Sequence, residues 1–223
     1  MDESLHWIRP IKNGGFESKD LAYEDGTNMR EFDICELIGG KPFPIKHQTE
    51  NYLVSEKNTF SLIKNLSETE KLTLLTKLCE NDVLAATKTK GELFKNLADR
   101  KMRSLVLIGP IDSFKIIYEK RFGKLAYMRH PELRFKLDED QTDETCLTCT
   151  DKRFFQFAKN IVKDLAVRGT VDSKGIKDFN SKRFFFVIGL SGDHLSDEGK
   201  MMDGKFRGYY WPFIVSVLSV PDY

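Results

Sequence analysis

Two cysteines at C-x-x-C spacing, Cys146 and Cys149, are the residues whose types and spacing come closest to a chemical site. They open the segment CLTCTDKRFFQFAKNIVKDL, residues 146–165, which is dense in phenylalanine. The spacing suits half of a zinc site, but a closed structural site needs four ligands. The sequence has no second C-x-x-C and no H-x-x-x-H pair. We therefore expect no metal at these cysteines.

A redox dithiol is the other chemistry that this spacing permits. It needs a thiol with a lowered pKa, and a helix capped by Asp151 would begin just after the pair. The surrounding acidic residues act in the opposite direction, because negative charges raise a thiol pKa, and no strand is expected to run into the motif. We expect Cys146 and Cys149 to be loop cysteines, free or forming a structural bridge. A thiol-redox or zinc-binding protein remains an alternative function.

Neither the histidines nor the glycine-containing turns suggest catalysis. His130 and His194 each have acidic residues nearby, but no nucleophile stands beside either of them. GPIDSF (109–114) and GLSGDH (189–194) follow expected strands without the spacing of a phosphate-binding loop. We predict no catalytic residue, no cofactor and no enzyme activity.

Charge and composition argue against a nucleic-acid or membrane partner. The 35 Lys and Arg residues nearly balance the 34 Asp and Glu residues, giving a formal net charge of +1. Such a balance creates no long-range field that would gather polyanions. The phenylalanines of DKRFFQF and SKRFFF fall where periodicity predicts core residues, not where bases would stack on an exposed platform. A near-neutral protein of this kind also associates easily.

The chain shows no targeting or membrane segment. No stretch approaches the roughly 20 apolar residues that a bilayer-spanning helix needs. The N-terminal residues MDESLHWIRP lack the basic-then-apolar order of a secretory signal. Four cysteines in 223 residues do not make a disulfide scaffold, which favours synthesis inside the cell.

Short strands and three helices are expected to position these residues. Capping boxes and the Asp151 cap predict helices near residues 68–81, 90–103 and 151–166. Apolar runs predict strands at 104–109, 113–119, 124–129, 133–137, 183–190 and 209–220. We expect one α+β domain of 223 residues, with an antiparallel sheet or sandwich in residues 51–223. Residues 1–50, with paired Gly and nearby Pro, are expected to form an extended N-terminal arm.

Five collinear segments resemble the polyhedrin and granulin family, the proteins that crystallise as the occlusion bodies of baculoviruses. They are NYLVSE (51–56), EKLTLLTKL (70–78), KGELF (90–94), YMRHPELR (127–134) and RFFQFAKNIV (153–162). The chain departs from the family in being shorter, in lacking its N-terminal basic cluster, and in residues 167–208, which have no counterpart. These departures point to a distant member, from another occlusion-forming insect virus such as a nudivirus.

The resemblance implies a structural function without chemistry. It implies a jelly-roll-like β-sandwich with helices and extended terminal arms, which forms trimers, packs into a lattice in the host cell nucleus and embeds virions. The partners would then be further copies of the chain and virions. Such crystals dissolve in alkali, and above about pH 10 lysines lose charge while tyrosines gain it. Every copy would then become anionic, which favours dissolution.

The resemblance also gives the opening motif a role. The family has a cysteine on the loop before its phenylalanine-glutamine-phenylalanine helix, and this cysteine joins trimers through a disulfide. Either Cys146 or Cys149 could serve here, so the assignment stays open. An α+β interaction module that forms no lattice is a further alternative.

Overall fold

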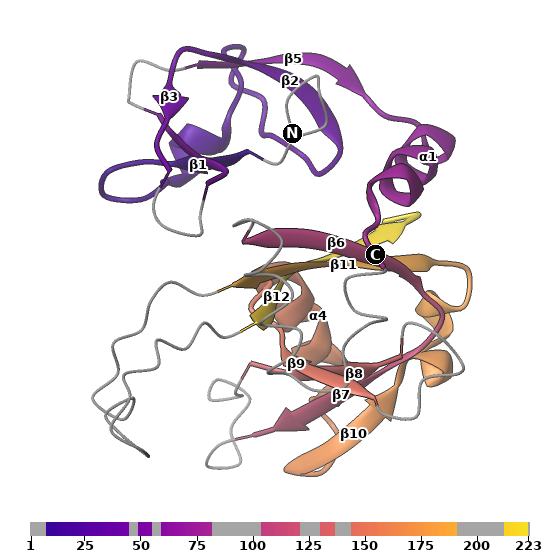
Figure 1. Ribbon diagram of the computed structural model, residues 1–223. Coiled ribbons are helices and arrows are strands. Elements are labelled where there is room, and N and C mark those ends of the chain that lie inside the picture. The colour runs from indigo at the N-terminus through magenta and orange to yellow at the C-terminus, as the bar shows by residue number, and fades with distance from the viewer. Residues whose placement is uncertain are drawn as a thin grey trace, which may run out of the picture. The chain divides into compact units, whose positions relative to one another are not determined.

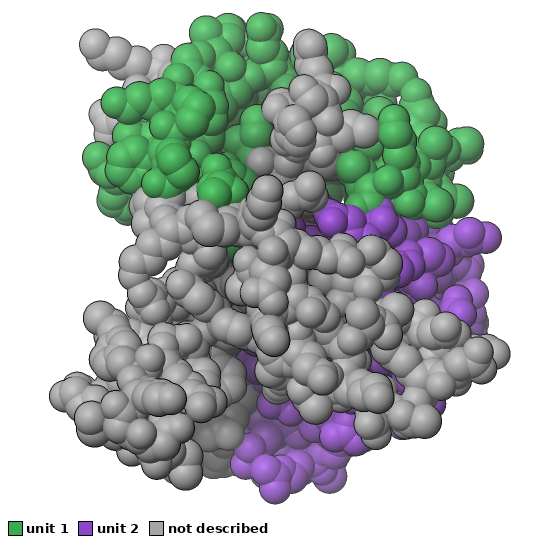
Figure 2. Space-filling model, in the orientation of Figure 1, with its two compact units in different colours: residues 1–78, 101–104 green, residues 79–100, 105–223 purple. Residues whose placement is uncertain are grey.

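The computed structural model describes residues 8–44, 49–54, 59–81, 104–120, 130–136, 144–190 and 212–222. The chain folds into two compact units, which Figure 2 colours separately. Unit 1 comprises residues 1–78 and 101–104, and unit 2 comprises residues 79–100 and 105–223. This division differs from the single domain expected from the sequence, in which no Gly- or Pro-rich linker and no charge run marks a boundary near residue 78.

Unit 1 contains two small sheets (Figure 1). The first has the order β1–β4–β3, with β1 (Arg9–Ile11) parallel to β4 (Asn51–Leu53) and β3 (Lys41–Pro42) antiparallel to β4. In the second, β2 (Asp33–Ile38) pairs with β5 (Thr59–Asn65) in antiparallel orientation. A short 3-10 helix, η1 (Ser18–Leu21), lies between β1 and β2. The N-terminal residues expected to form an extended arm thus contribute β1, β2 and β3 to a compact unit.

Helix α1 (Glu68–Leu78) begins at the predicted capping box. The Ser67 backbone N–H donates to Glu70 Oε2 at 2.9 Å, and the Glu70 N–H donates to Ser67 Oγ at 3.4 Å. Lys64, at the end of β5, donates to the same Glu70 carboxylate. These contacts join the strand to the first turn of the helix. The hydrogen bonds that the Glu70 carboxylate accepts lower its pKa from 4.5 to about 2, and the one from Lys64 contributes most, followed by those from Ser67.

Replacing Glu70 with glutamine is expected to flatten the dependence of unfolding on acidic pH. A carboxylate whose pKa is lowered in the folded state stabilises the fold above its unfolded pKa, and this stabilisation is lost as pH falls through the folded pKa. The wild-type chain should therefore exceed Glu70→Gln in urea midpoint above pH 4.5, and the gap should close towards pH 2. Urea titrations across this range test the prediction. Glu68→Gln, which removes a charge from the same turn without touching the cap, is the control.

Unit 2 is built on two antiparallel sheets (Figure 1). The first has the order β10–β7–β8–β9, and the second has the order β12–β11–β6. The strands of the first sheet are β7 (Phe114–Glu119), β8 (Glu132–Phe135), β9 (Thr145–Thr148) and β10 (Arg168–Asp172). Those of the second are β6 (Leu105–Ile111), β11 (Arg183–Leu190) and β12 (Pro212–Val220). Helix α4 (Lys152–Val162) follows β9, and the 3-10 turns η4 (Ser173–Gly175) and η5 (Lys177–Phe179) follow β10.

Two links close these sheets into a barrel. On one side, β6 runs through Asp112 and Ser113 directly into β7, so one bent segment belongs to both sheets. On the other side, Cys149, just after β9, forms a parallel bridge with Ile214 of β12. If β6–β7 is counted as the first strand, β8, β9, β11 and β12 are the second to the fifth, and their order around the barrel is 1-2-3-5-4-1. The third and fifth strands are parallel, and α4 follows the third. This is the topology of the OB fold, a five-stranded Greek-key barrel, to which β10 adds an edge strand.

Phenylalanines fill the barrel and are contributed by both sheets and by α4. Phe114, at the start of β7, lies 5.1 Å from Phe184 and 5.4 Å from Phe186, both in edge-to-face contact. Its ring centroid is also 6.1 Å from Phe154 of α4 and 5.8 Å from Phe179 of η5. Such tilted pairs stabilise the core beyond the area they bury. The predicted assignment of the FFQF and RFFF phenylalanines to core holds for Phe154, Phe184, Phe185 and Phe186, whereas Phe155 and Phe157 are only partly buried.

Both ends of α4 are hydrogen-bonded to strands of the barrel. At its N-terminus Asp151 accepts from the N–H groups of Arg153 and Phe154, and its second oxygen accepts from the Val217 N–H of β12 at 2.9 Å. At its C-terminal end the buried Lys120, just after β7, donates to the carbonyls of Leu165 at 2.6 Å and Lys163 at 3.1 Å. An anion at the N-terminus and a cation at the C-terminus also suit the helix dipole.

Gly109 allows β6 to bulge within the second sheet. Its φ of 138° is one that L side chains rarely adopt, and a Cβ there would meet Phe185 Cδ1 at 2.7 Å. The register between β6 and β11 shifts at this point. The Asn81 side chain binds the freed backbone groups, donating to Gly109 O at 2.7 Å and accepting from Gly109 N at 2.8 Å. The Asn81 amide therefore pairs with the Gly109 backbone as a neighbouring strand would.

The predicted elements are found in part. Helices expected at 68–81 and 151–166 correspond to α1 and α4, and Asp151 is the cap. However, α4 ends at Val162, short of the expected residue 166, and Leu165 beyond it is 46 % exposed. The strand expected at 133–137 corresponds to β8, which pairs with a strand on each side. The helix expected at 90–103 and the strand at 124–129 lie outside the described residues. The α+β class is confirmed, with a strand order that is not specifically that of a jelly roll.

Candidate functional site

The outer surface of the first sheet of unit 2 is polar and is called the β7–β8 face here. Inward residues of β7 and β8 alternate with outward ones, so the buried Phe114 and Phe135 flank the outward positions Lys115 and Arg134. Lys115 pairs in register with Arg134 of β8, which pairs with Cys146 of β9. The outward residues of the face are Lys115, Ile117, Glu119, Glu132, Arg134, Cys146, Thr148, Arg168, Thr170 and Asp172.

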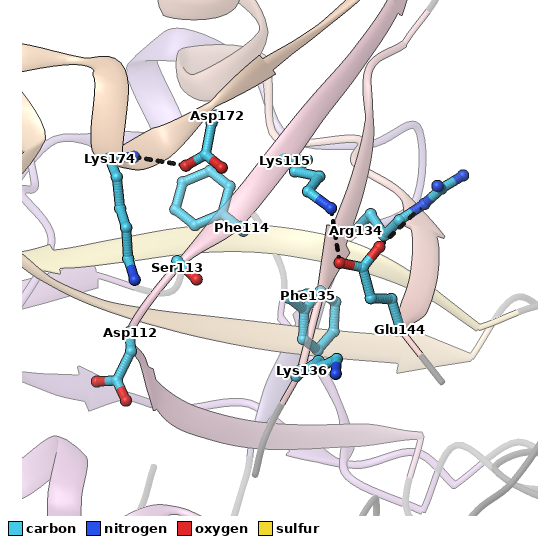
Figure 3. Close-up of a pocket in the computed structure, with 10 residues that line it drawn as sticks. All are labelled: Asp112, Ser113, Phe114, Lys115, Arg134, Phe135, Lys136, Glu144, Asp172 and Lys174. Atoms are coloured by element: carbon cyan, nitrogen blue, oxygen red, sulfur yellow. Dashed lines mark hydrogen bonds and ion pairs between the residues drawn. The ribbon is translucent and has the colours of Figure 1, made fainter. Parts of the chain in front are cut away.

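A pocket of about 140 Å³ lies at the end of this face where β7 begins and β8 ends (Figure 3). Figure 3 shows charged side chains from β7, β8, β10 and the residues around them arranged about it. The basic residues of its lining are Lys115, Arg134, Lys136 and Lys174, and the acidic ones are Asp112, Glu144 and Asp172. This density of charge at one small cavity suits an ionic ligand better than an apolar one.

Glu144 neutralises two of the four cations. Its Oε1 lies 2.8 Å from Lys115 Nζ and its Oε2 lies 3.7 Å from Arg134 Nε. All three side chains are partly exposed, at 29 % for Glu144, 41 % for Lys115 and 46 % for Arg134. Asp172 instead accepts from the backbone N–H of Lys174 at 2.9 Å and caps η4. Among the described residues, no ion pair is found for the side chains of Lys136 and Lys174.

At the opposite end of the face, two chain connections rejoin the barrel close together. The β7–β8 connection ends at Pro131, whose carbonyl accepts from Cys149 N at 2.8 Å. The β11–β12 connection ends just before Pro212, and Thr150 N donates to Ile214 O of β12 at 2.8 Å. The two connections therefore return on either side of the end of β9, about 10 Å apart at two strand spacings. The paths of residues 121–129 and 191–211 lie outside the described structure.

An aromatic and basic group lies at this same end. His130, the last residue but one of the β7–β8 connection, is exposed, and its ring lies 5.4 Å from that of Phe155 in α4. Lys159 Nζ lies 5.6 Å from the centroid of the same Phe155 ring. Phe155 packs against the core but is only partly buried, unlike its neighbour Phe154. Helix α4 therefore places a ring and an ammonium group, from Phe155 and Lys159, beside His130 of the connection.

The two cysteines of the C-x-x-C motif do not form a site. Cys146 lies on β9 and Cys149 directly after it, not in a loop as expected. Two residues that are three positions apart in an extended chain point to opposite faces. Cys146 Sγ faces outward, 3.4 Å from Glu132 Oε2, whereas Cys149 is fully buried in the core. Burial raises the pKa of Cys149 to about 12, which opposes thiolate chemistry. Of the two, only Cys146 could reach another subunit without opening the barrel.

Neither a metal site nor a membrane span is found in the described part of the chain. Within the described ranges, no three His, Cys, Asp or Glu side chains come together in a way that could hold a metal ion. The described helices are too short or too polar to cross a bilayer. Of the two histidines with acidic neighbours in the sequence, His130 contacts Phe155, and His194 lies outside the described residues.

Sequence reasoning did not find the residues of the pocket. Alternation in FKIIYE and PELRFKL could have shown that Lys115, Arg134 and Lys136 share the outward side of two strands. Nothing in the sequence pairs these strands with each other, or brings Glu144 and Lys174 to their ends. That arrangement depends on the sheet order β10–β7–β8–β9.

Comparison with protein families agrees with the barrel topology. Residues 1–213 match the family DuOB, described as the dual OB-containing domain. No curated protein and no solved structure matches the chain. The match covers most of the chain and includes the whole of unit 1 together with the barrel of unit 2 as far as the start of β12. The chain therefore belongs to the dual OB-containing domain family.

Proposed function

We propose that unit 2 is a non-catalytic module that binds single-stranded nucleic acid across the β7–β8 face. OB barrels bind oligonucleotides and oligosaccharides on their second and third strands, between the connections that follow the first and fourth strands. In this barrel the second and third strands are β8 and β9. The β7–β8 connection follows the first strand, and the β11–β12 connection follows the fourth. The observation that carries the proposal is that both connections rejoin the barrel beside the end of β9.

The sequences of these connections favour nucleic acid over sugar. Residues 121–129, RFGKLAYMR, combine basic and aromatic residues without any acid. In the β11–β12 connection the last eight residues, GKFRGYYW (204–211), do the same, whereas residues 191–203 carry four acids. Bases of any sequence stack on aromatic rings while cations contact the backbone phosphates, which is how OB folds hold single strands. The exposed His130 and the half-buried Phe155 and Lys159 lie at the same end of the face.

The neutral net charge, which argued against nucleic acid at the level of the sequence, averages over the whole chain. Single-strand binding requires a local basic track and not an overall field, although a net charge of +1 predicts modest affinity. Strand β7 spans about 17 Å at roughly 3.3 Å per residue, so a short oligonucleotide is sufficient to cross the face.

Fluorescence anisotropy with a labelled oligothymidylate of about 12 nucleotides tests the proposal, because OB sites cover about 4–16 nucleotides. We expect binding that weakens with salt, and Arg134→Ala should reduce the affinity about threefold to tenfold through the loss of a phosphate contact. Arg183→Ala, an exposed arginine on β11 of the other sheet, is the matched control and should change the affinity less than twofold, within the ordinary effect of a remote charge.

The competing ligands are compared in the same assay. A duplex of equal length and a neutral oligosaccharide should bind more weakly than the single strand. Absence of binding to the single strand at low salt by both the wild type and its charge variants, or stronger binding to the oligosaccharide, would contradict the proposal.

Self-assembly into an occlusion-body matrix remains the second candidate. It rests on the resemblance to polyhedrin and on the large apolar side chains exposed on β2 and β5 of unit 1, of which Ile63 is 64 % and Ile38 is 50 % exposed. Such surface favours association. The jelly-roll-like core, terminal arms, trimers and a disulfide through Cys146 belong to this proposal. Expression in insect cells should then give refractile crystals that dissolve in alkaline carbonate, whereas a soluble monomer would argue against it.

A further inference from the structure

The pocket at the end of the β7–β8 face contains a carboxylate in the position of a ligand anion. Glu144 presents one oxygen to Lys115 at 2.8 Å and the other to Arg134 at 3.7 Å (Figure 3). The two cations come from adjacent strands and are partners in register. A phosphate group that bridged the same two side chains would use two of its oxygens in the same way.

The surrounding charges suit an anion larger than a carboxylate. Lys136 follows β8 and Lys174 lies in η4, and both line the same pocket of about 140 Å³. Within the part of the chain that the structure describes, neither ammonium group forms an ion pair. Of the pocket's three acids, Asp172 is bound to the Lys174 backbone N–H, and Asp112 forms no ion pair with a pocket cation among the described residues. Glu144 is the anion that Lys115 and Arg134 share.

The contacts of Glu144 are weak enough to be exchanged. Ion pairs between partly exposed side chains contribute little, because water screens them and ordering long side chains costs entropy. A backbone phosphate offers a full charge and more acceptor oxygens, and Arg and Lys bind it through charge-assisted hydrogen bonds. Glu144 can therefore hold the two cations in place while the pocket is empty and still give way to phosphate.

We propose that this pocket is the phosphate subsite of the β7–β8 face and that Glu144 is an internal competitor for it. This inference rests on the proposed binding of single-stranded nucleic acid. The strand would place one backbone phosphate on Lys115 and Arg134, near Lys136 and Lys174, at the end of the face opposite to the two connections. Glu144 sets the affinity by competing for the same cations.

Replacing Glu144 with glutamine tests the competition. Glu144→Gln is expected to raise the affinity for the labelled oligothymidylate about threefold to tenfold, which corresponds to the loss of two weak ion pairs. Because Lys115 and Arg134 can then neutralise phosphate fully, more cations should leave the strand on binding, and the slope of log affinity against log salt should steepen by about 0.7.

Two variants separate a local effect from a general change in charge. Glu36→Gln, at an exposed position on β2 of unit 1, removes the same charge and should leave both affinity and salt slope unchanged. Adding Lys115→Ala to Glu144→Gln should abolish most of the gain. Competition by inorganic phosphate should be stronger for Glu144→Gln than for the wild type, because phosphate groups share this chemistry whatever molecule bears them.

The outcomes distinguish the inference from the function on which it rests. If the wild type binds the single strand but Glu144→Gln gains no more than Glu36→Gln, the subsite is overturned and the binding function stands. If neither the wild type nor Glu144→Gln binds the strand at low salt, the binding function itself fails. Binding by Glu144→Gln alone would support both, with Glu144 as the inhibiting group.

Discussion

Phe114→Ala is expected to lower the free energy of unfolding of unit 2 by about 4 kcal/mol, within the 3–5 kcal/mol typical of buried Phe to Ala changes. The ring is 2 % exposed and contacts the rings of Phe154, Phe179, Phe184 and Phe186, so its removal leaves a cavity that α4 and both sheets border. This loss is a large fraction of the total free energy of unfolding, which is only about 5–15 kcal/mol for a typical domain. Urea unfolding followed by circular dichroism measures it.

Two further variants show whether this loss comes from the position of the ring. Phe114→Leu keeps most of the volume and should recover more than half of the loss. Leu165→Ala removes a side chain that is 46 % exposed and should cost less than about 1 kcal/mol. A loss below about 1.5 kcal/mol for Phe114→Ala would contradict a central position of this ring in the barrel core.

Asp151→Ala is expected to lower the free energy of unfolding by about 3 kcal/mol. The change removes an N-cap, which alone costs about 0.5–2 kcal/mol. It also leaves the buried N–H groups of Phe154 and Val217 without their acceptor, and each such group costs about 1–3 kcal/mol. The helix and β12 lose their common partner together, so the effect exceeds that of an ordinary cap.

Asparagine at the same position separates the two roles. In Asp151→Asn one oxygen still caps α4, but the amide NH₂ then faces the Val217 N–H and cannot accept from it. We expect the free energy of unfolding of Asp151→Asn to lie between those of the wild type and Asp151→Ala. Asp172→Ala removes an exposed cap of the short turn η4 and should cost less than about 1 kcal/mol. Equal losses for Asp151→Ala and Asp172→Ala would show that the bond to β12 adds nothing.

Local features of the fold could be predicted from neighbouring residues because they depend on short-range chemistry. The box of Ser67 and Glu70 defines the start of α1, and Asp151 defines that of α4. The continuous apolar run RFFFVIGL becomes β11, which is buried on both faces. Each of these patterns is decided by residues within a few positions of one another.

Longer-range features could not be predicted in this way. The C-x-x-C motif was expected in a loop because its short strand of four residues, TCLT, has no distinctive pattern, and its pairing partner β8 comes from a different segment. The single domain expected from length and composition also differs from the two units, because compactness depends on contacts distant in sequence. No Pro-rich or charged linker signals the change.

The candidate site is the feature that depends most on tertiary structure. Lys115, Arg134, Glu144 and Lys174 come from four segments whose sequences say nothing about one another. The sequence by itself determined where α1, α4 and most strands of unit 2 begin, and that the phenylalanines of RFFF and Phe154 of α4 belong to the core, because hydrophobic period and capping are local. Only the tertiary structure decided that β6 and β7 bend into a closed barrel, that Cys149 is buried, and that Glu144 meets two cations. Strand pairing depends on contacts between residues that are distant in sequence and that form together with the core.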